Sequence, residues 1–391
     1  MPAVMIHVQH LLGIGHFMRA RLIAGALADA GFDTHLVTGG RPTGGRLPHG
    51  VRTIQLPPIH ASDGTLKPLR DADGQPVDDA YRRRRRDLLL EAYESAAPDV
   101  VIFETFPFGR RALHFEIVPL LERIASTRRR PLVIASVRDI LQKRDNVERE
   151  REMLLSAQRW FDAVLVHGDR RFSRLDETFP LASELGIPVH YTGFVVANAE
   201  SPSIPDARGR NEVVVSAGGG TVGVNLLTTA LAAQKRSRFG HLRWRTLAGP
   251  NIPNDVFERL RDAAAPGTIV ERAREDFAAL LGQALISVSQ AGYNTVLDVV
   301  RSGARPVVVP FAEEGETEQR MRANRLRELE LAVVVDDGAD SPVALADAID
   351  TAGSREKWGR WDFDCDGAAR SAALVASMIE TGAGQLEGRA T

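Results

Sequence analysis

The stretch SVSQAGYNTVLDVVRSGARPVVVPF, residues 287–311, decides the fold of the second half of the chain. Its apolar runs and its glycine predict a strand, a turn, a helix and a second strand, over 285–288, 290–292, 294–301 and 306–310. Gly292 stands where the predicted helix begins, and Asp298 follows within that helix. A strand that passes through a glycine turn into a helix and then into another strand is the unit of a parallel, doubly wound sheet.

The same alternation extends in both directions from this stretch. In the second half we predict further strands at 212–217, 242–247, 268–270 and 332–335. In the first half we predict strands at 4–9, 34–38, 100–103, 132–136, 163–167 and 189–192, with helices at 16–30 and 80–96. The alternation therefore starts twice, once in each half.

Residues 197–211, ANAESPSIPDARGRN, interrupt this alternation and have the composition of a linker. We therefore predict an α/β protein with two Rossmann-like, doubly wound parallel-sheet domains that face each other across a cleft. The predicted domains are 1–196 and 212–355, and a helical tail over 356–391 contains a helix near 368–381.

Composition excludes several classes of protein. The chain has 391 residues, 44% of them hydrophobic, and a net charge of −2. Nucleic-acid binders are usually basic, so this charge argues against that class. The single cysteine, Cys365, excludes an intrachain disulfide. The N-terminal stretch resembles no signal peptide, and no apolar run is long enough to cross a bilayer, so we expect a cytoplasmic protein.

Two arginine runs, Arg82–Arg86 and Arg128–Arg130, interrupt this balance of charge. One interpretation is a solvated helix face and a basic loop. The other is a patch that contacts anionic lipid or an anionic acceptor, which would make the protein peripheral to the inner membrane face. The sequence leaves both interpretations open.

Two glycine-rich turns join a strand to a helix. The first is Gly13-Ile14-Gly15-His16, and the second is SAGGGTVG at 216–223. A helix N-terminus there offers backbone N–H groups, and glycine lets a phosphate approach closely. The second turn also fits G-x-G-x-x-G, yet the strand that follows it ends without the acidic residue that holds an adenosine ribose. This absence disfavours an NAD site.

At these residues the chain resembles the C-terminal domain of GT-B glycosyltransferases. It is most similar to the family of the peptidoglycan N-acetylglucosaminyltransferase that forms lipid II, in a less-studied branch of predicted bacterial glycosyltransferases. The resemblance covers nearly the whole chain and is looser in the N-terminal half. Arg322-Ala323 stands where many relatives have Asn-Ala, and the first glycine loop is shorter than theirs.

The resemblance implies a set of donor-binding residues. The loop Gly219, Gly220, Thr221 and Gly223 corresponds to the family's Gly-Gly-Ser-x-Gly loop at the donor phosphates. Gly292 matches the glycine at the diphosphate-binding helix, and Asp298 takes the place of a glutamate on the donor ribose. The implied donor site is completed by Ser289, Asn294, Glu318 and Gln319, the last two matching a pair that contacts the sugar.

The resemblance also implies a mechanism on the acceptor side. His16 is the preferred base, because a neutral imidazole is available near pH 7. Glu104, at the end of a strand, is the second candidate for a catalytic residue. The loop residues Gly13 and Gly15, together with Arg138, would shape the acceptor side.

We therefore expect a nucleotide-sugar substrate, UDP-linked by resemblance and with N-acetylglucosamine as the leading sugar. The acceptor is unknown, and a lipid-linked or otherwise anionic one is compatible with the arginine runs. No aspartate pair stands where a metal-dependent transferase has one, so we predict no metal and no cofactor. Three rival functions stay open, namely a nucleotide-sugar 2-epimerase, a non-catalytic nucleotide-sugar-binding protein and an NAD-dependent oxidoreductase.

Overall fold

The structure is a computed structural model that describes residues 1–11, 13–43, 47–61, 68–143, 146–197, 210–218, 223–250, 252–311, 315–336 and 340–387. The chain divides into two compact units. Unit 1 comprises Met1–Val196 and Phe363–Thr391, and unit 2 comprises Ala197–Asp362.

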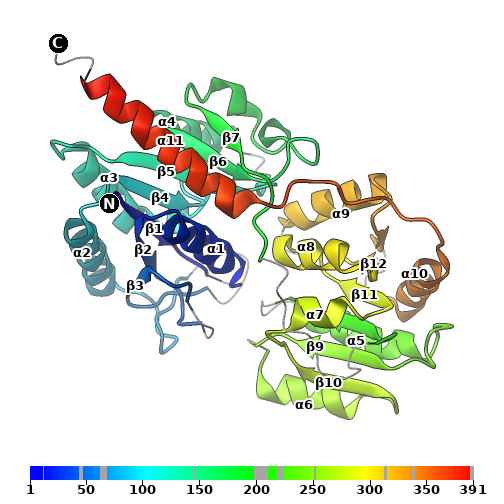
Figure 1. Ribbon diagram of the computed structural model, residues 1–391. Coiled ribbons are helices and arrows are strands. Elements are labelled where there is room, and N and C mark those ends of the chain that lie inside the picture. The colour runs from blue at the N-terminus through cyan, green and yellow to red at the C-terminus, as the bar shows by residue number, and fades with distance from the viewer. Residues whose placement is uncertain are drawn as a thin grey trace. The chain divides into compact units, whose positions relative to one another are not determined.

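Unit 1 is built on a parallel sheet of seven strands in the order β3-β2-β1-β4-β5-β6-β7 (Figure 1). Because β4 pairs with the other side of β1, the direction of winding reverses between these two strands. Open α/β sheets bind ligands at this switch point, at the carboxyl ends of the strands. The strands are β1 Ala3–Val8, β2 Asp33–Thr38, β3 Val51–Gln55, β4 Val100–Glu104, β5 Leu132–Arg138, β6 Ala163–His167 and β7 Val189–Tyr191.

Helices cover both faces of this sheet because successive residues of each strand point to opposite faces. In β1, Val4 and Ile6 belong to one buried cluster and Met5 to the other. The first cluster includes residues of α1 and α11, and the second includes residues of α2, α3 and α4. These helices are α1 Gly15–Asp29, α2 Asp79–Ala96, α3 His114–Ala125, α4 Val147–Trp160 and α11 Gly367–Glu387, and 3₁₀ turns occupy Arg111–Leu113, Leu175–Glu177 and Pro180–Glu184.

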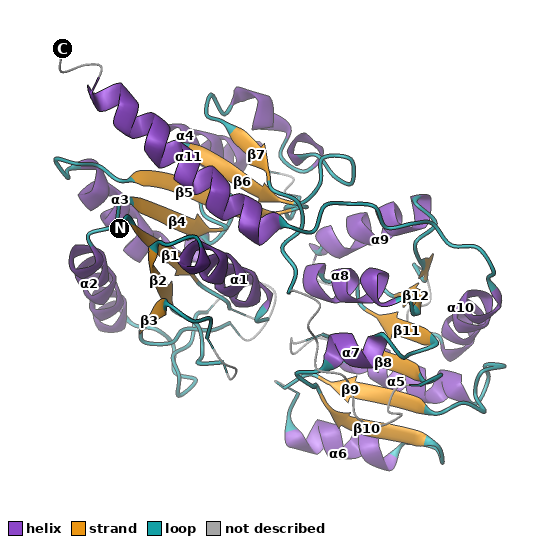
Figure 2. Cartoon of the chain, in the orientation of Figure 1, coloured by secondary structure: helices purple, strands orange, loops and turns teal. Residues whose placement is uncertain are grey.

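Unit 2 repeats this topology with six parallel strands in the order β10-β9-β8-β11-β12-β13 (Figure 2). Its switch point therefore lies between β8 and β11, the strands that precede the second glycine loop and Gly292. The strands are β8 Val213–Ser216, β9 Trp244–Ala248, β10 Thr268–Arg272, β11 Ile286–Ser289, β12 Arg305–Val308 and β13 Val333–Val334. The helices are α5 Val224–Gln234, α6 Asn254–Asp262, α7 Phe277–Leu281, α8 Tyr293–Ser302, α9 Glu318–Glu328 and α10 Pro342–Ser354.

These two doubly wound sheets confirm the predicted fold class. One strand, β3, was not predicted. It is an edge strand with the sequence VRTIQ, in which Arg52, Thr53 and Gln55 are exposed. An edge strand needs few buried apolar residues, so its apolar pattern is weak.

Residues 356–391, which we predicted as a helical tail, divide between the two units after residue 362. Helix α11, drawn in red in Figure 1, packs in the same buried cluster as α1, with Ala372 and Val375 buried beside Phe17 and Ala24. The backbone N–H of Gly367 donates to the carbonyl of Phe194 over 3.0 Å. The C-terminal helix therefore completes the layer that covers one face of the first sheet.

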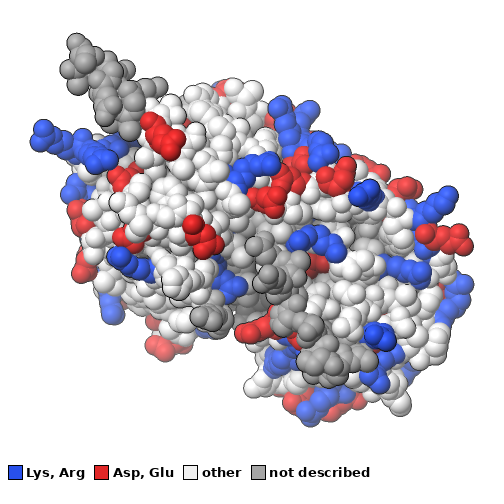
Figure 3. All heavy atoms as spheres, viewed as in Figure 1, with Lys and Arg blue, Asp and Glu red and all other residues white. Residues whose placement is uncertain are grey.

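The arginines of the two runs differ from one another in burial and in pairing. Arg85 is fully buried, whereas Arg82, Arg83 and Arg84 are exposed. In the second run Arg130 pairs with Asp162 over 2.8 Å. On the face drawn in Figure 3, acidic side chains are interspersed with the basic ones. The interpretation of Arg82–Arg86 as a solvated helix face is therefore wrong at Arg85. Contact of the exposed arginines with lipid stays a prediction.

Candidate functional site

The candidate site of unit 1 lies at its switch point. Helix α1 starts at Gly15, directly after the loop that follows β1, and places His16 in its first turn. Glu104 is the last residue of β4, the neighbour of β1. The topology thus brings together two residues that are 88 positions apart in sequence. Both predicted catalytic residues lie at the edge where such sheets bind ligands.

His16 and Glu104 are in direct contact. The Nδ1 atom of His16 lies 3.0 Å from Oε1 of Glu104. The His16 side chain is 11% exposed and that of Glu104 only 1%. An ionised carboxylate can only accept a hydrogen bond, so the contact with Glu104 requires the proton on Nδ1 of His16 and leaves Nε2 bare. The Arg19 guanidinium, which can only donate and lies 3.3 Å from the same Nδ1, is in this tautomer bonded to Glu104 and not to the imidazole. A bare Nε2 oriented by a carboxylate is the arrangement that a histidine base requires.

Glu104 is held as an anion. Burial would raise its pKa, but the Arg19 guanidinium, which donates to Oε1, and the bonds from His16 and Ser136 outweigh that effect and hold its pKa far below the ordinary value. The Ser136 hydroxyl donates to Oε2 over 2.7 Å. Because Glu104 is buried and ionised, it suits the role of orienting His16 better than that of meeting a substrate.

The residue after Glu104 has a strained backbone. Thr105 has a φ of 74°, a left-handed conformation that is rare for β-branched residues. This conformation places Oγ1 of Thr105 3.1 Å from Nδ1 of His16. Backbone strain of this kind concentrates at functional sites, where the surrounding structure maintains it.

The electrostatics of unit 1 keep His16 neutral. Burial lowers its pKa well below the ordinary value, and the positive charges of Arg110 and Arg138 lower it further, against the opposing hydrogen bond to Glu104. Arg138 ends β5, at the same edge of the sheet, and is half-buried. Gly13 lies in the loop before α1, and Gly15 is the first residue of that helix. A neutral His16 at pH 7 is the form that can accept a proton.

This burial predicts how the stability of unit 1 depends on pH. Burial lowers the pKa of His167 to about 3, and that of His16 is lowered as well. Below about pH 6.5 the unfolded chain binds protons that the folded chain excludes, so the free energy of unfolding falls as the pH falls. We expect His167 alone to account for a loss of roughly 2 kcal/mol at pH 5.

Urea unfolding between pH 7.5 and 5, followed by hydrogen exchange of β4 to β6, would measure this loss. A His167→Gln variant should have a shallower pH dependence, because glutamine does not titrate. A free energy of unfolding that stays constant over this range would contradict the prediction.

In unit 2 the second glycine loop is described only in part. Gly219, Gly220 and Thr221 lie outside the described residues. Gly218 and Gly223 have φ values of 73° and 120°, and a Cβ on Gly223 would clash with the side chain of Ala217. The backbone therefore requires glycine at these two positions whatever the loop binds.

Gly292 differs from those glycines. It precedes α8 with a φ of −65°, which any residue adopts, and among the described residues a Cβ there would meet nothing within 4 Å. Neither the backbone nor the packing of the described residues requires a glycine, so those residues leave space open at this helix N-terminus. Ser289, the last residue of β11, is buried, and its hydroxyl has no hydrogen-bond partner among the described residues. Such a combination suits the approach of a phosphate.

Helix α8 also contains Asn294 and Asp298. Asn294 lies in its first turn. Burial raises the pKa of Asp298 to about 6, against the lowering effect of Arg301. A carboxylate with so few compensating partners would gain from a hydrogen-bond donor such as a ribose hydroxyl.

The predicted sugar-contacting pair is engaged within the protein. Gln319 accepts, through Oε1, from the backbone N–H groups of Ala291 and Phe311, over 3.0 and 3.1 Å. Glu318 pairs with Arg322 over 3.0 Å, and both side chains are buried. Arg322 also donates to the carbonyl of Ala291 over 2.8 Å. The pair thus braces the loop before Gly292, and contact with a sugar stays a prediction.

Sequence reasoning missed several of these residues. Arg19, Ser136 and His167 join the cluster around Glu104, and Arg322 joins the loop of unit 2. Their positions in the sequence could have indicated a place near the site. Ser136 and His167 lie near the carboxyl ends of strands, and Arg19 lies three residues after His16.

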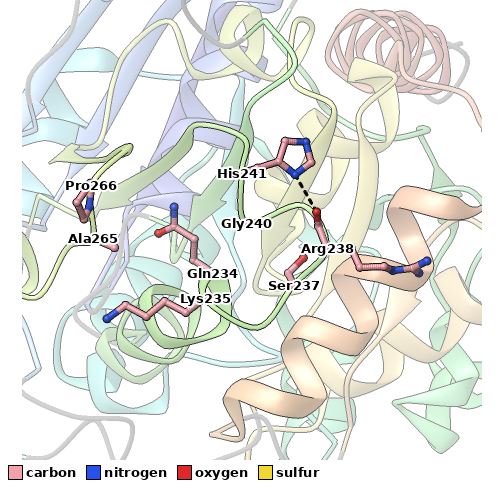
Figure 4. Close-up of a pocket in the computed structure, with 8 residues that line it drawn as sticks. All are labelled: Gln234, Lys235, Ser237, Arg238, Gly240, His241, Ala265 and Pro266. Atoms are coloured by element: carbon pink, nitrogen blue, oxygen red, sulfur yellow. Dashed lines mark hydrogen bonds between the residues drawn. The ribbon is translucent and has the colours of Figure 1, made fainter.

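A surface pocket of unit 2 lies elsewhere. Its lining comes from the segments that precede β9 and β10, so it sits at the amino-terminal edge of the strands, opposite Gly292. Figure 4 shows it lined by Gln234, Lys235, Ser237, Arg238, Gly240, His241, Ala265 and Pro266. Arg238 is itself paired with Asp350 over 3.1 Å.

The described part of the chain contains neither a metal-binding cluster nor a membrane-spanning helix. No group of three or more His, Cys, Asp or Glu side chains there is arranged to hold a metal ion. No helix in the same residues has the length and hydropathy needed to cross a membrane. The predicted independence of metal is not tested by this.

Residues 214–357 match the glycosyltransferase family 28 C-terminal domain. This range falls within unit 2 and contains both of its glycine loops. No curated protein matches the chain.

Solved structures extend the similarity to both units. Spinosyn rhamnosyltransferase SpnG has 16% identity and a TM-score of 0.59, covering 97% of this chain and 96% of its own. A UDP-glucosyltransferase from Polygonum tinctorium has 15% identity and a TM-score of 0.59, covering 97% and 99%. MurG from Acinetobacter baumannii has 15% identity and a TM-score of 0.54, covering 97% and 99%. At these identities the likeness concerns the fold.

The matched segment is a glycosyltransferase domain, and the two-sheet fold of the chain is that of GT-B glycosyltransferases. The predicted resemblance to GT-B glycosyltransferases is thereby confirmed for the fold and for the matched C-terminal domain, and the finer resemblance to the peptidoglycan N-acetylglucosaminyltransferase family stays a prediction.

Proposed function

We propose that the protein transfers a sugar from a UDP-linked donor to an acceptor hydroxyl without a metal, with His16 as the general base. The observation that supports this most directly is the contact between Nδ1 of His16 and the buried, ionised Glu104. This contact leaves Nε2 bare at the ligand-binding edge of the first sheet.

The proposed reaction is a single displacement at the anomeric carbon. The acceptor oxygen forms a bond to that carbon while its proton passes to Nε2 of His16. The bond between the anomeric carbon and the diphosphate oxygen breaks, and the nucleoside diphosphate leaves with the electron pair. Glu104 stabilises the imidazolium that forms, and His16 then releases its proton to solvent.

The leaving diphosphate would lie at the N-terminus of α8. The open space at Gly292 admits a phosphate, and the helix dipole favours its negative charge. Ser289 and Asn294 would contact the donor from either side, with Asp298 on the ribose. Gly219, Gly220, Thr221 and Gly223 complete the proposed donor site in the loop after β8.

The finer identity rests on resemblance. UDP is proposed because the family resemblance implies it and because a structural neighbour is named a UDP-glucosyltransferase. N-acetylglucosamine is proposed as the sugar, since the sequence resembles the peptidoglycan N-acetylglucosaminyltransferase family. The proposed location is cytoplasmic, at the inner membrane face if the acceptor is lipid-linked.

Calorimetric titration with UDP in EDTA tests the donor site, with ADP, GDP, dTDP and NAD as parallel ligands. Selective binding of UDP is the expected result. Binding of dTDP or GDP alone would change the proposed donor, and binding of NAD alone would overturn the proposal. Incubation of UDP-N-acetylglucosamine without acceptor adds a second test, because a changed sugar would indicate an epimerase.

Gly292→Ala should weaken UDP binding by about tenfold or more, equivalent to about 1.4 kcal/mol, because its methyl group enters the space that the diphosphate needs. The fold should be unaffected, since the φ of −65° suits alanine and no atom of the described residues lies within 4 Å of the added Cβ. The matched control is Gly282→Ala, at the opposite edge of the same sheet, where φ is −61°. Equal UDP affinity in both variants would remove Gly292 from the site.

A further inference from the structure

A chain of hydrogen bonds leads from Glu104 into the interior of unit 1. Oε2 of Glu104 accepts from the hydroxyl of Ser136 over 2.7 Å, and Oγ of Ser136 lies 2.8 Å from Nε2 of His167. Nδ1 of His167 lies 2.9 Å from Oγ1 of Thr192. The chain crosses the ends of β4, β5 and β6 and reaches the residue after β7. With His16 at its outer end, it links five side chains.

The hydrogens of this chain can be placed in only one direction. Ser136 donates its single hydroxyl hydrogen to Glu104, so its oxygen must accept a hydrogen bond from Nε2–H of His167. Nδ1 of His167 is then bare and accepts from the hydroxyl of Thr192. If Thr192 donated instead to the carbonyl of Gly193, 3.0 Å away, two lone pairs would face each other between His167 and Ser136. Every bond therefore points toward the Glu104 carboxylate.

Burial makes this network costly to leave incomplete. Ser136 is 1% exposed, and His167 and Thr192 are fully buried. His167 faces the charges of Arg19 and Glu104, and burial with Arg19 keeps it neutral. His16, in turn, faces Glu104, Arg19, Arg110 and Arg138. A second buried histidine whose ring is bonded to the serine that donates to Glu104 needs an explanation beyond packing.

We propose that Ser136 and His167 are positioning residues that act through Glu104 to hold His16 in the tautomer whose Nε2 is bare. This inference rests on the proposed role of His16 as the base, but the network itself can be tested without any substrate. Ser136 fixes the rotation of the carboxylate, so that Oε1 faces Nδ1 of His16. It also disperses part of the carboxylate charge, and His167 ensures that the serine hydroxyl points to Glu104.

The charge dispersal predicts a direction. Without the Ser136 hydroxyl, more negative charge stays on Glu104, and a protonated His16 is stabilised. Ser136→Ala should therefore raise the pKa of His16, by roughly 0.5 to 1 unit. His167→Leu should act in the same direction, because the serine hydroxyl loses its orienting donor. His167→Gln should restore the wild-type behaviour, since its amide can donate to Ser136 and accept from Thr192.

The experiment is NMR of the full chain with isotope-labelled histidine, titrated with acid. The chain has ten histidines, and the signal absent from His16→Gln assigns His16. The nitrogen shifts report the tautomer, and the carbon-bound proton reports the pKa. Ser173→Ala is the matched control, because Ser173 is a buried serine of unit 1 whose hydroxyl has no partner in the described part of the chain. Hydrogen exchange of β4 to β6 checks that each variant is folded.

In the wild type we expect His16 to have a bare Nε2. The pKa of His16 should be raised in Ser136→Ala and His167→Leu. It should be unchanged in Ser173→Ala and His167→Gln. A His16 protonated on Nε2, or an equal pKa in folded Ser136→Ala and Ser173→Ala, would overturn the inference. If Ser136→Ala fails to fold, the comparison of His167→Leu with His167→Gln decides. Failure of UDP binding would instead contradict the proposed function and leave this result intact.

Discussion

His16→Ala is expected to lower sugar transfer by about 100-fold to 10,000-fold, the range that removal of a general base typically produces. The imidazole is the only group of the Glu104 cluster that is both partly exposed and bare at one nitrogen, whereas the carboxylate behind it is 1% exposed. UDP binding should be unchanged, because the proposed donor site belongs to unit 2. The loss should therefore appear in kcat and not in affinity for the donor.

The measurement is UDP release from UDP-N-acetylglucosamine in the presence of acceptor extracts. His49→Ala is a suitable control, because His49 is an exposed histidine of the same unit. The turnover of Glu104→Gln should lie between that of His16→Ala and that of His49→Ala, since glutamine can still accept a hydrogen bond from Nδ1 of His16 but supplies no charge. Turnover of His16→Ala close to that of His49→Ala would remove His16 from the role of base.

Arg85→Met is expected to destabilise unit 1 by about 3–5 kcal/mol, because it leaves a buried charge without its partner. Arg85 and Glu116 are both fully buried and form two bonds, of 2.7 and 2.8 Å. Arg85 also donates to Oε1 of Gln9, over 3.0 Å, and to the carbonyl of Gly39, over 3.1 Å. Burial would raise the pKa of Glu116, but Arg85 outweighs this and holds that pKa at about 2.

Denaturant unfolding of unit 1, read by hydrogen exchange, would measure this loss. Arg84→Met, one position away on the exposed face of α2, should change the free energy of unfolding by less than about 0.5 kcal/mol. The double variant Arg85→Met with Glu116→Leu should regain much of the loss, because it removes both buried charges. Equal stability of the two single variants would show that the Arg85 pair contributes nothing.

Local sequence patterns predicted most of the fold. Strand β6, at Ala163–His167, has the predicted bounds, and α1 and α2 begin within one residue of theirs. These elements are predictable because burial on a sheet or helix leaves its period in a single stretch of chain. The strand β3 lies at an edge, where one face needs no apolar residues, and its pattern was accordingly too weak to read.

The candidate site was predictable in part. Glycine turns after strands and polar residues at strand ends led to His16, Glu104 and Gly292, because in parallel sheets such positions gather at one edge. The sequence could not reveal that Glu104 is buried behind His16, or that Gln319 and Glu318 brace the loop before Gly292. Those facts depend on side chains that arrive from other elements.

By itself, the sequence determined the fold class, the two starts of the alternation and the residues available at the edges of both sheets. Only the tertiary structure decided how those residues are used. It buried Arg85 within a run of exposed arginines, set Glu104 behind His16 and connected it to His167. The physical reason is that periodicity and glycine turns are local properties, whereas burial and hydrogen bonding depend on the order in which distant strands pair.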